Sequence, residues 1–256
     1  IRFCFWVSLL KMARVLTIFD TDGVQALFDA PFLDFVNKDW KRKTGKNPDY
    51  QASDIDSWRF DLKSEKIIKK GLAVGIEPGW FLDYLIKFVE RGYFASLPVI
   101  PGSREAVSYL KRENYKDLFV VTDRINSIKK ENLSTYDELE QQRRLGHKIQ
   151  EDTILWYATK FRGIFTNDEI HFADGRSKSE IITILKFNGR YDLAIIVEDS
   201  YKHSISHASS SSTNYSFLLD KQYNQGPNAE RVFRITGKSP EIQFAKLVQS
   251  IEDLTN

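Results

Sequence analysis

Short apolar runs that end abruptly at polar residues recur along this chain. Each run has four or five residues, is rich in β-branched side chains and is bounded by turn-forming or charged positions. Such runs are typical of fully buried strands in a sheet that is covered on both faces. The pattern therefore predicts three core strands, at Val15–Phe19, Leu118–Val121 and Leu193–Val197.

Between the first two strands the spacing of apolar residues changes from continuous runs to a helical period. Lys43–Pro48 interrupts this pattern as a polar loop. Apolar residues that recur every three or four positions predict amphipathic helices. The helical pattern comprises two groups, namely Leu27, Phe28, Phe32, Phe35 and Val36, and then Trp80, Phe81, Tyr84, Leu85 and Phe88.

Strands that alternate with helical segments predict an α/β fold. We expect a Rossmann-like, doubly wound and mostly parallel sheet, with a small helical cap inserted after the first strand. Residues 12–25 and 97–256 would form the core, and residues 26–96 the cap. Residues 1–11 are interpreted as an upstream or non-native extension, because Met12 is the single methionine and stands where such a protein would start.

Composition narrows the classes of partner. The net charge of +2 among 256 residues does not require a nucleic-acid polymer as partner. The apolar opening Ile1–Leu10 is too short to span a bilayer, so no membrane partner is expected. The single cysteine, Cys4, excludes an internal disulfide framework and favours a reducing, cytoplasmic location.

Acidic residues follow the first strand at once, in Asp20-Thr21-Asp22-Gly23. Carboxyl ends of parallel strands are where open α/β sheets place their chemistry. Two carboxylates there suit a hard cation, a covalent nucleophile or both. A calcium-binding loop is excluded, because Val24 and Pro31 stand at its fifth and twelfth positions. For this segment alone, a plain turn with solvated aspartates remains an alternative.

Three further segments complete an ordered set. Thr122 ends the second strand, Lys178 precedes a helical pattern, and Glu198-Asp199 ends the third strand. The order of Asp-x-Asp-Gly, threonine, lysine and the acidic pair resembles the haloacid dehalogenase-like phosphohydrolase superfamily. Within it, the chain is similar to the 5′(3′)-deoxyribonucleotidases, a narrower likeness that rests on Glu77–Phe81, Leu97–Val107 and Leu218–Gln225.

The resemblance implies a role for each residue of the set. Asp20 would attack phosphorus, and Asp22 would exchange a proton with the leaving group. Mg²⁺ would be the cofactor, bound by Asp20, Asp22 and Asp199, with Glu198 as a further carboxylate. Phosphate contacts would come from Thr122, Asp123, Lys178 and Gly23. Asp123 departs from the family pattern, because a carboxylate beside phosphate is unfavourable unless it points away or pairs with Arg124.

Aromatic residues of the cap are candidates for reading the substrate, since a nucleobase can stack on such rings. The alternative for each ring is a place in the cap's own core. Because His171, His203 and His207 lack the spacing of a metal site, they are interpreted as structural. The substrate-binding candidates are Phe28, Trp58, Trp80, Phe81 and Arg124.

The function that the resemblance implies is a Mg²⁺-dependent phosphomonoesterase, and most specifically a 5′-nucleotidase that acts through an aspartyl-phosphate. Its partner would be a small phosphomonoester, and a homodimer is compatible with this reading. Two alternatives stay open, because a fold does not fix specificity. One is a phosphatase of a sugar phosphate or another small phosphometabolite. The other is a catalytically silent binding protein on the same fold.

Overall fold

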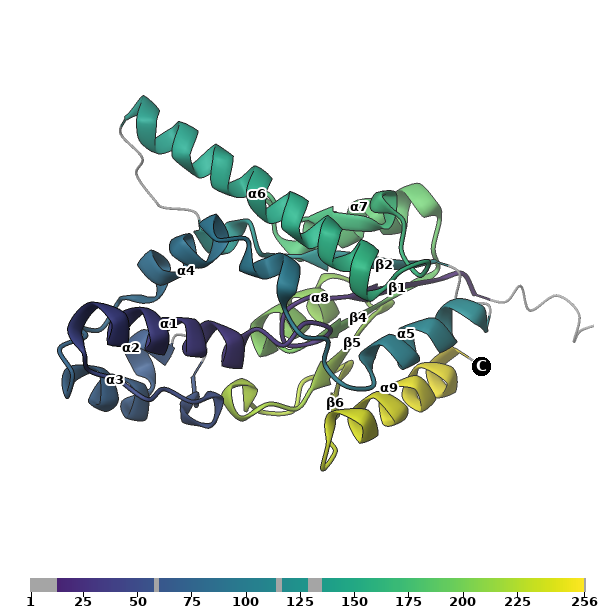
Figure 1. Cartoon of the computed structure of the whole chain (residues 1–256). Coiled ribbons are helices and arrows are strands. Elements are labelled where there is room, and N and C mark those ends of the chain that lie inside the picture. Colours follow the sequence, from purple (N-terminus) through teal and green to yellow (C-terminus); the bar gives the residue numbers. More distant parts are fainter. Residues whose placement is uncertain (1–12, 58–59, 114–116, 129–134, 256) are drawn as a thin grey trace, which may run out of the picture.

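The computed structural model describes residues 13–57, 60–113, 117–128 and 135–255 (Figure 1). The extension 1–11 and the candidate Trp58 lie outside these described residues. None of the helices within them is long and apolar enough to cross a membrane.

A six-stranded sheet forms the centre of the molecule, and all of its neighbouring strands are parallel. The strand order is β3-β2-β1-β4-β5-β6, which is doubly wound, so the predicted fold class is confirmed. The order reverses between β1 and β4, and at such a point the carboxyl ends of the strands open onto a crevice. The strands are β1 (Val15–Phe19), β2 (Leu118–Thr122), β3 (Ile170–Phe172), β4 (Leu193–Glu198), β5 (Asn214–Leu219) and β6 (Val232–Ile235).

Alternate residues of the strands enter two different apolar clusters, because successive side chains of a strand point to opposite faces. Leu16 and Ile18 of β1 pack with Ile182 on one face. Phe19 belongs to the larger cluster of the other face, together with Leu110. Both faces of the sheet are therefore buried, which explains why its strands read as continuous apolar runs rather than as alternating ones.

Helices cover the two faces and one end of this sheet. Residues of α5, α6 and α9 enter the larger cluster, whereas α7 supplies the smaller one and contacts α8. The helices α1 to α4 gather beyond one end of the sheet, and α6 extends toward the same side above α4 (Figure 1). The helices are α1 (Asp29–Thr44), α2 (Phe60–Lys63), α3 (Glu65–Leu72), α4 (Phe81–Glu90), α5 (Ser103–Arg112), α6 (Tyr136–Lys160), α7 (Lys178–Gly189), α8 (Tyr201–Ser210) and α9 (Pro240–Thr255).

The helical insertion between β1 and α5 has an aromatic core of its own. The ring of Phe32 stacks on that of Phe28 at 5.0 Å and on that of Trp80 at 6.2 Å, and it meets Phe88 edge-on at 5.5 Å. Trp80 also stacks on Tyr50 at 5.3 Å. Several short helices can pack stably here because large rings bury much apolar surface and interact favourably in these geometries. Treating residues 26–96 as a separate cap remains a prediction.

A buried histidine in α8 makes the free energy of unfolding depend on pH. His207 lies in α8 with Nε2 3.4 Å from the carbonyl oxygen of Ala194, and burial lowers its pKa from 6.5 to about 4. The folded state therefore holds a neutral ring, while the unfolded chain takes up a proton as the pH falls below about 6.5. We expect His207 to account for a loss of about 2 kcal/mol in unfolding free energy between pH 7 and pH 5.

Urea unfolding at the two pH values, with His207→Gln beside the unmodified chain, measures this contribution. The glutamine amide can still donate to Ala194 but does not titrate. An equal loss of stability in both proteins would show that other groups cause the acid sensitivity.

Candidate active site

A cavity of about 100 Å³ opens at the carboxyl ends of β1, β2 and β4, where the strand order reverses. One side carries polar groups that follow these strands, and the other carries aromatic and aliphatic side chains of the helical insertion. The structure therefore brings together the ordered set of polar residues that the sequence singled out. The lining residues are Asp20, Asp22, Phe28, Phe81, Leu85, Phe94, Thr122, Asp123, Arg124, Lys178, Asp199, Ser200 and His203.

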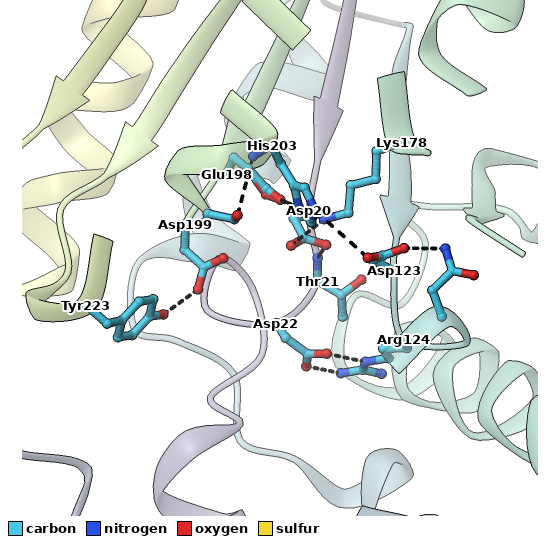
Figure 2. A network of polar contacts seen from close by, with 12 residues as sticks. Asp20, Thr21, Asp22, Asp123, Arg124, Lys178, Glu198, Asp199, His203 and Tyr223 are labelled. Atoms are coloured by element: carbon cyan, nitrogen blue, oxygen red, sulfur yellow. Dashed lines mark hydrogen bonds and ion pairs between the residues drawn. The ribbon is translucent and has the colours of Figure 1, made fainter. Parts of the chain in front are cut away.

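Lys178 joins two carboxylates at the floor of this cavity (Figure 2). Its Nζ lies 2.7 Å from Oδ2 of Asp20 and 2.6 Å from Oε1 of Glu198, and its side chain is 3% exposed. Lys178 is the first residue of α7, and a capping box fixes this helix start. In that box Ser177 accepts from the backbone N–H of Glu180 at 3.2 Å, and Glu180 accepts from that of Ser177 at 2.6 Å.

Burial and neighbouring charges both shift the pKa values of these groups. Burial, together with repulsion from Glu198, raises the pKa of Asp20 well above its usual range. Burial alone would also raise the pKa of Glu198, but Lys178 and His203 lower it to about 2. Although burial opposes its charge, Lys178 has a raised pKa because Asp20 and Glu198 favour the ammonium form. Lys178 and Glu198 therefore form a buried ion pair beside Asp20.

The carboxylate of Asp22 is directed toward Arg124, which holds it (Figure 2). The guanidinium donates from Nε and Nη2 to the two carboxylate oxygens, at 2.8 and 2.6 Å. Arg124 is itself fixed, because Nη1 donates to Thr153 of α6 at 3.0 Å and the guanidinium lies 4.4 Å from the ring centroid of Phe94. Its side chain is 1% exposed, so this bidentate pair sets the orientation of Asp22.

The side chains of Thr122 and Asp123 differ in their hydrogen-bond partners. The hydroxyl of Thr122 is buried at the cavity and has no hydrogen-bond partner within the described part of the chain. Such a group suits a ligand oxygen, since buried polar atoms are nearly always paired. Asp123 accepts from Nδ2 of Asn126 at 2.6 Å, and the same amide nitrogen donates to the carbonyl oxygen of Arg176 at 3.1 Å. Asn126 thus ties the loop after β2 to the loop before Lys178.

Three carboxylates form a group that fits a divalent cation. Each of Asp20, Glu198 and Asp199 places an oxygen within 4.8 Å of the others, and all three are buried. Burial, and next to it repulsion from Glu198, raise the pKa of Asp199 to about 7. Lys178 balances one of their charges, and an oxygen-bound Mg²⁺ would balance the other two. Gly23 lies directly against Asp199 and leaves no room for a side chain.

The predicted substrate-binding residues of the insertion divide into two groups. Phe28, Phe81 and Arg124 line the cavity. Trp80, by contrast, is buried between Tyr50 and Phe32 in the core of the insertion, and it does not reach the cavity. Trp80 therefore belongs to the core of the insertion rather than to the lining of the cavity.

His203 was interpreted as structural from the sequence, but it lines the cavity. Its Nδ1 lies 3.3 Å from Oε1 of Glu198, and its Nε2 lies 3.9 Å from Oδ2 of Asp123. It stands in the first turn of α8, whose start is capped by Ser200. The position of His203 in the sequence, shortly after the acidic pair Glu198-Asp199, could have identified it as a residue of the site. A helix that begins directly after the acidic pair turns its third residue back toward the strand ends.

No protein-family model and no curated protein matches this chain significantly. Solved structures do match it over nearly its whole length. A HAD family hydrolase from Deinococcus radiodurans R1, solved with bound phosphate and sodium, has a TM-score of 0.53 and 14% identity, over 94% of this chain and 96% of that one.

Two other solved structures match at lower TM-scores. A haloacid dehalogenase-like family hydrolase from Xanthomonas campestris has a TM-score of 0.46 and 11% identity, over 95% of this chain and 98% of that one. A HAD-superfamily hydrolase of subfamily IA from Geobacter sulfurreducens PCA has a TM-score of 0.44 and 13% identity, over 96% of this chain and 97% of that one. At such identities the Deinococcus likeness establishes a shared fold. The chain has the Rossmann-like fold of haloacid dehalogenase-type hydrolases.

Proposed function

We propose that this protein is a Mg²⁺-dependent phosphomonoesterase of the haloacid dehalogenase type, and that its substrates are nucleoside or deoxynucleoside 5′-monophosphates. One observation carries the phosphatase part of the proposal. A buried carboxylate, Asp20, contacts a buried lysine at the floor of a cavity that is also lined by Thr122, whose hydroxyl has no hydrogen-bond partner among the described residues. The phosphate bound in the Deinococcus hydrolase, which shares this fold, supports the same assignment.

The chemistry would proceed in two steps on Asp20. Its carboxylate oxygen attacks phosphorus, the bond from phosphorus to the leaving oxygen breaks, and that oxygen takes a proton from Asp22. Water then attacks the aspartyl-phosphate, gives a proton to Asp22, and releases inorganic phosphate together with free Asp20. Lys178 and Thr122 would hold the phosphate oxygens.

Asp20, Asp199 and the backbone of Asp22 would hold Mg²⁺, with Glu198 behind them. When bound, this cation supplies the positive charge that lets an anionic nucleophile approach a phosphate dianion. In the structure Glu198 is engaged by Lys178 and does not line the cavity. We therefore assign to Glu198 the role of keeping Lys178 charged and in place.

The choice of a nucleotide rests on the apolar wall of the cavity. Phe28 and Phe81 face the acidic strand ends and are half-buried, so their rings can stack on a base. Base stacking on aromatic side chains contributes about 1–3 kcal/mol per base and depends little on base identity. Ser200 and His203 add polar groups on the side of the sheet.

Cavity size favours a second candidate, a phosphatase of a sugar phosphate or another small phosphometabolite. The volume of about 100 Å³ is below the range of about 300–1,000 Å³ that is typical of pockets for larger ligands. A nucleotide would therefore require the helical insertion to move away from the sheet, whereas a small leaving group would not.

Phosphate release from a substrate panel tests both candidates. The panel contains nucleoside 5′- and 3′-monophosphates, sugar phosphates and p-nitrophenyl phosphate, each with and without Mg²⁺. We expect Mg²⁺-dependent release that is fastest from nucleotides. Faster release from sugar phosphates would select the second candidate, and no release from any compound would reject the phosphatase assignment.

Phe81→Leu tests the stacking wall within the same panel. We expect its KM for nucleotides to rise about 5- to 100-fold, because the leucine keeps the apolar wall and removes the ring. KM for a sugar phosphate should stay unchanged. Phe60→Leu is the matched control, since that ring packs against Phe81 at 5.3 Å but does not line the cavity. An equal rise in both variants would assign the effect to packing.

A further inference from the structure

The segment that follows β5 contacts the candidate metal ligand Asp199 in two ways. The phenol of Tyr223 donates a hydrogen bond to Oδ2 of Asp199, and Figure 2 shows the ring pointing at this carboxylate. The adjacent Asn224 donates from Nδ2 to the backbone oxygen of Asp199 at 2.8 Å. Both residues belong to the short 3₁₀ turn Gln222–Asn224, which lies outside the four phosphatase motifs of the sequence.

These contacts give the two carboxylate oxygens of Asp199 different surroundings. Oδ2 accepts from Tyr223, and the same oxygen lies over Gly23, where an added Cβ would come within 1.7 Å of it. Because Oδ2 already accepts this hydrogen bond, we assign Oδ1 to the acidic group that Asp199 forms with Asp20 and Glu198. The side chain is also buried, at 2% exposure of the residue, so its rotation is restricted on every side.

We propose that Tyr223 is a positioning residue for the metal site, and that its hydroxyl holds the carboxylate of Asp199 in the orientation that binds Mg²⁺. The proposal rests on the proposed function, because it takes Asp199 to be a metal ligand. Carboxylate ligands in proteins are commonly hydrogen-bonded by outer residues, and loss of such a partner weakens metal binding about 10- to 100-fold. A phenol suits this task because it is protonated at neutral pH and supplies a single directed donor.

The backbone around Tyr223 does not depend on this hydroxyl. Asn224 donates to the carbonyl oxygen of Leu219 at 2.7 Å and accepts from the backbone N–H of Lys221 at 3.1 Å and from Arg234 at 2.9 Å. These bonds hold the turn against β5 and β6. Removal of the phenolic oxygen by Tyr223→Phe should therefore leave the fold intact and release the carboxylate of Asp199.

Isothermal titration calorimetry with Mg²⁺ alone, without substrate, tests the proposal. We expect Tyr223→Phe to bind Mg²⁺ at least about tenfold more weakly than the unmodified protein. Tyr201→Phe is the matched control, because that hydroxyl donates to the carbonyl oxygen of Pro227 at 2.7 Å, in the loop that follows the same turn. This control should keep the original affinity, and thermal melting of both variants without metal checks the fold.

Each outcome decides the matter. Unchanged Mg²⁺ affinity in Tyr223→Phe, or an equal loss in Tyr201→Phe, would overturn the positioning role. Absence of Mg²⁺ binding in the unmodified protein would overturn the metal site and this proposal with it. If Mg²⁺ binds and Tyr223→Phe weakens it while the substrate panel gives no phosphate, the positioning role stands and the phosphatase assignment fails.

Discussion

Asp20→Asn is expected to lower kcat for phosphate release by more than about 1,000-fold, because an amide cannot serve as the anionic nucleophile. The substitution keeps the shape of the side chain. Lys178 retains Glu198 as a partner at 2.6 Å, so the protein should still fold. Steady-state release of phosphate from the best substrate of the panel, with circular dichroism as a check of folding, measures the effect. A kcat close to that of the unmodified enzyme would exclude Asp20 as nucleophile.

Asp22→Asn separates the role of Asp20 as nucleophile from the role of Asp22 in proton exchange. The variant keeps the nucleophile but cannot exchange a proton, so it should still be phosphorylated by p-nitrophenyl phosphate, whose leaving group needs little protonation. Acid quenching and mass spectrometry should then find the phosphoryl group on the peptide that contains Asp20. No covalent phosphate should form in Asp20→Asn, and its appearance there would place the nucleophile on another residue.

The strand ends could be predicted from sequence because strong local signals coincide there. Continuous apolar runs fix β1, β2 and β4, and in a doubly wound sheet their carboxyl ends must meet. Lys178 follows from an equally local signal, since the serine and glutamate of its capping box define the start of α7. These features depend on neighbouring residues in the chain, so one sequence is enough to find them.

Which aromatic side chains of the helical insertion face the cavity could not be predicted in this way. Trp80 and Phe81 are adjacent and both aromatic, yet the first is buried in the core of the insertion and the second lines the cavity. Neighbouring residues at the start of a helix point about 100° apart, so the rotation of α4 decides which ring meets the substrate. That rotation depends on packing against Phe32 and Phe60, which no spacing rule encodes.

Contacts between residues far apart in the sequence explain the other features of the site that could not be predicted. Arg124 lines the cavity, and its role as a substrate contact stays a prediction, but its pairing with Asp22 and its contacts with Thr153 and Phe94 could not be read from the sequence. Its partners are far apart in sequence, and an isolated arginine carries no signal of which carboxylate it will meet. His203 shows the same limit, because a lone histidine has no spacing signature until the helix that carries it is placed.

Gly23→Ala is expected to lower kcat/KM by about 100-fold or more, the cost that a displacement of about 1 Å can have at a reacting centre. A Cβ at this position would lie 1.7 Å from Oδ2 of Asp199, so the carboxylate must move. Since that oxygen also accepts from Tyr223, the same displacement would break the contact that orients Asp199. Weaker Mg²⁺ binding, measured by calorimetry, should accompany the loss of activity.

Gly163→Ala separates this collision from backbone strain. Both glycines have a positive φ, of 71° at Gly23 and 76° at Gly163, so alanine strains the two positions alike, by about 1–2 kcal/mol. At Gly163 an added Cβ would meet nothing within 4 Å. We therefore expect Gly163→Ala to be less stable but fully active. If both variants lost activity to the same extent, the effect at Gly23 would be one of folding. The space beside Gly23 would then not be required for the position of Asp199.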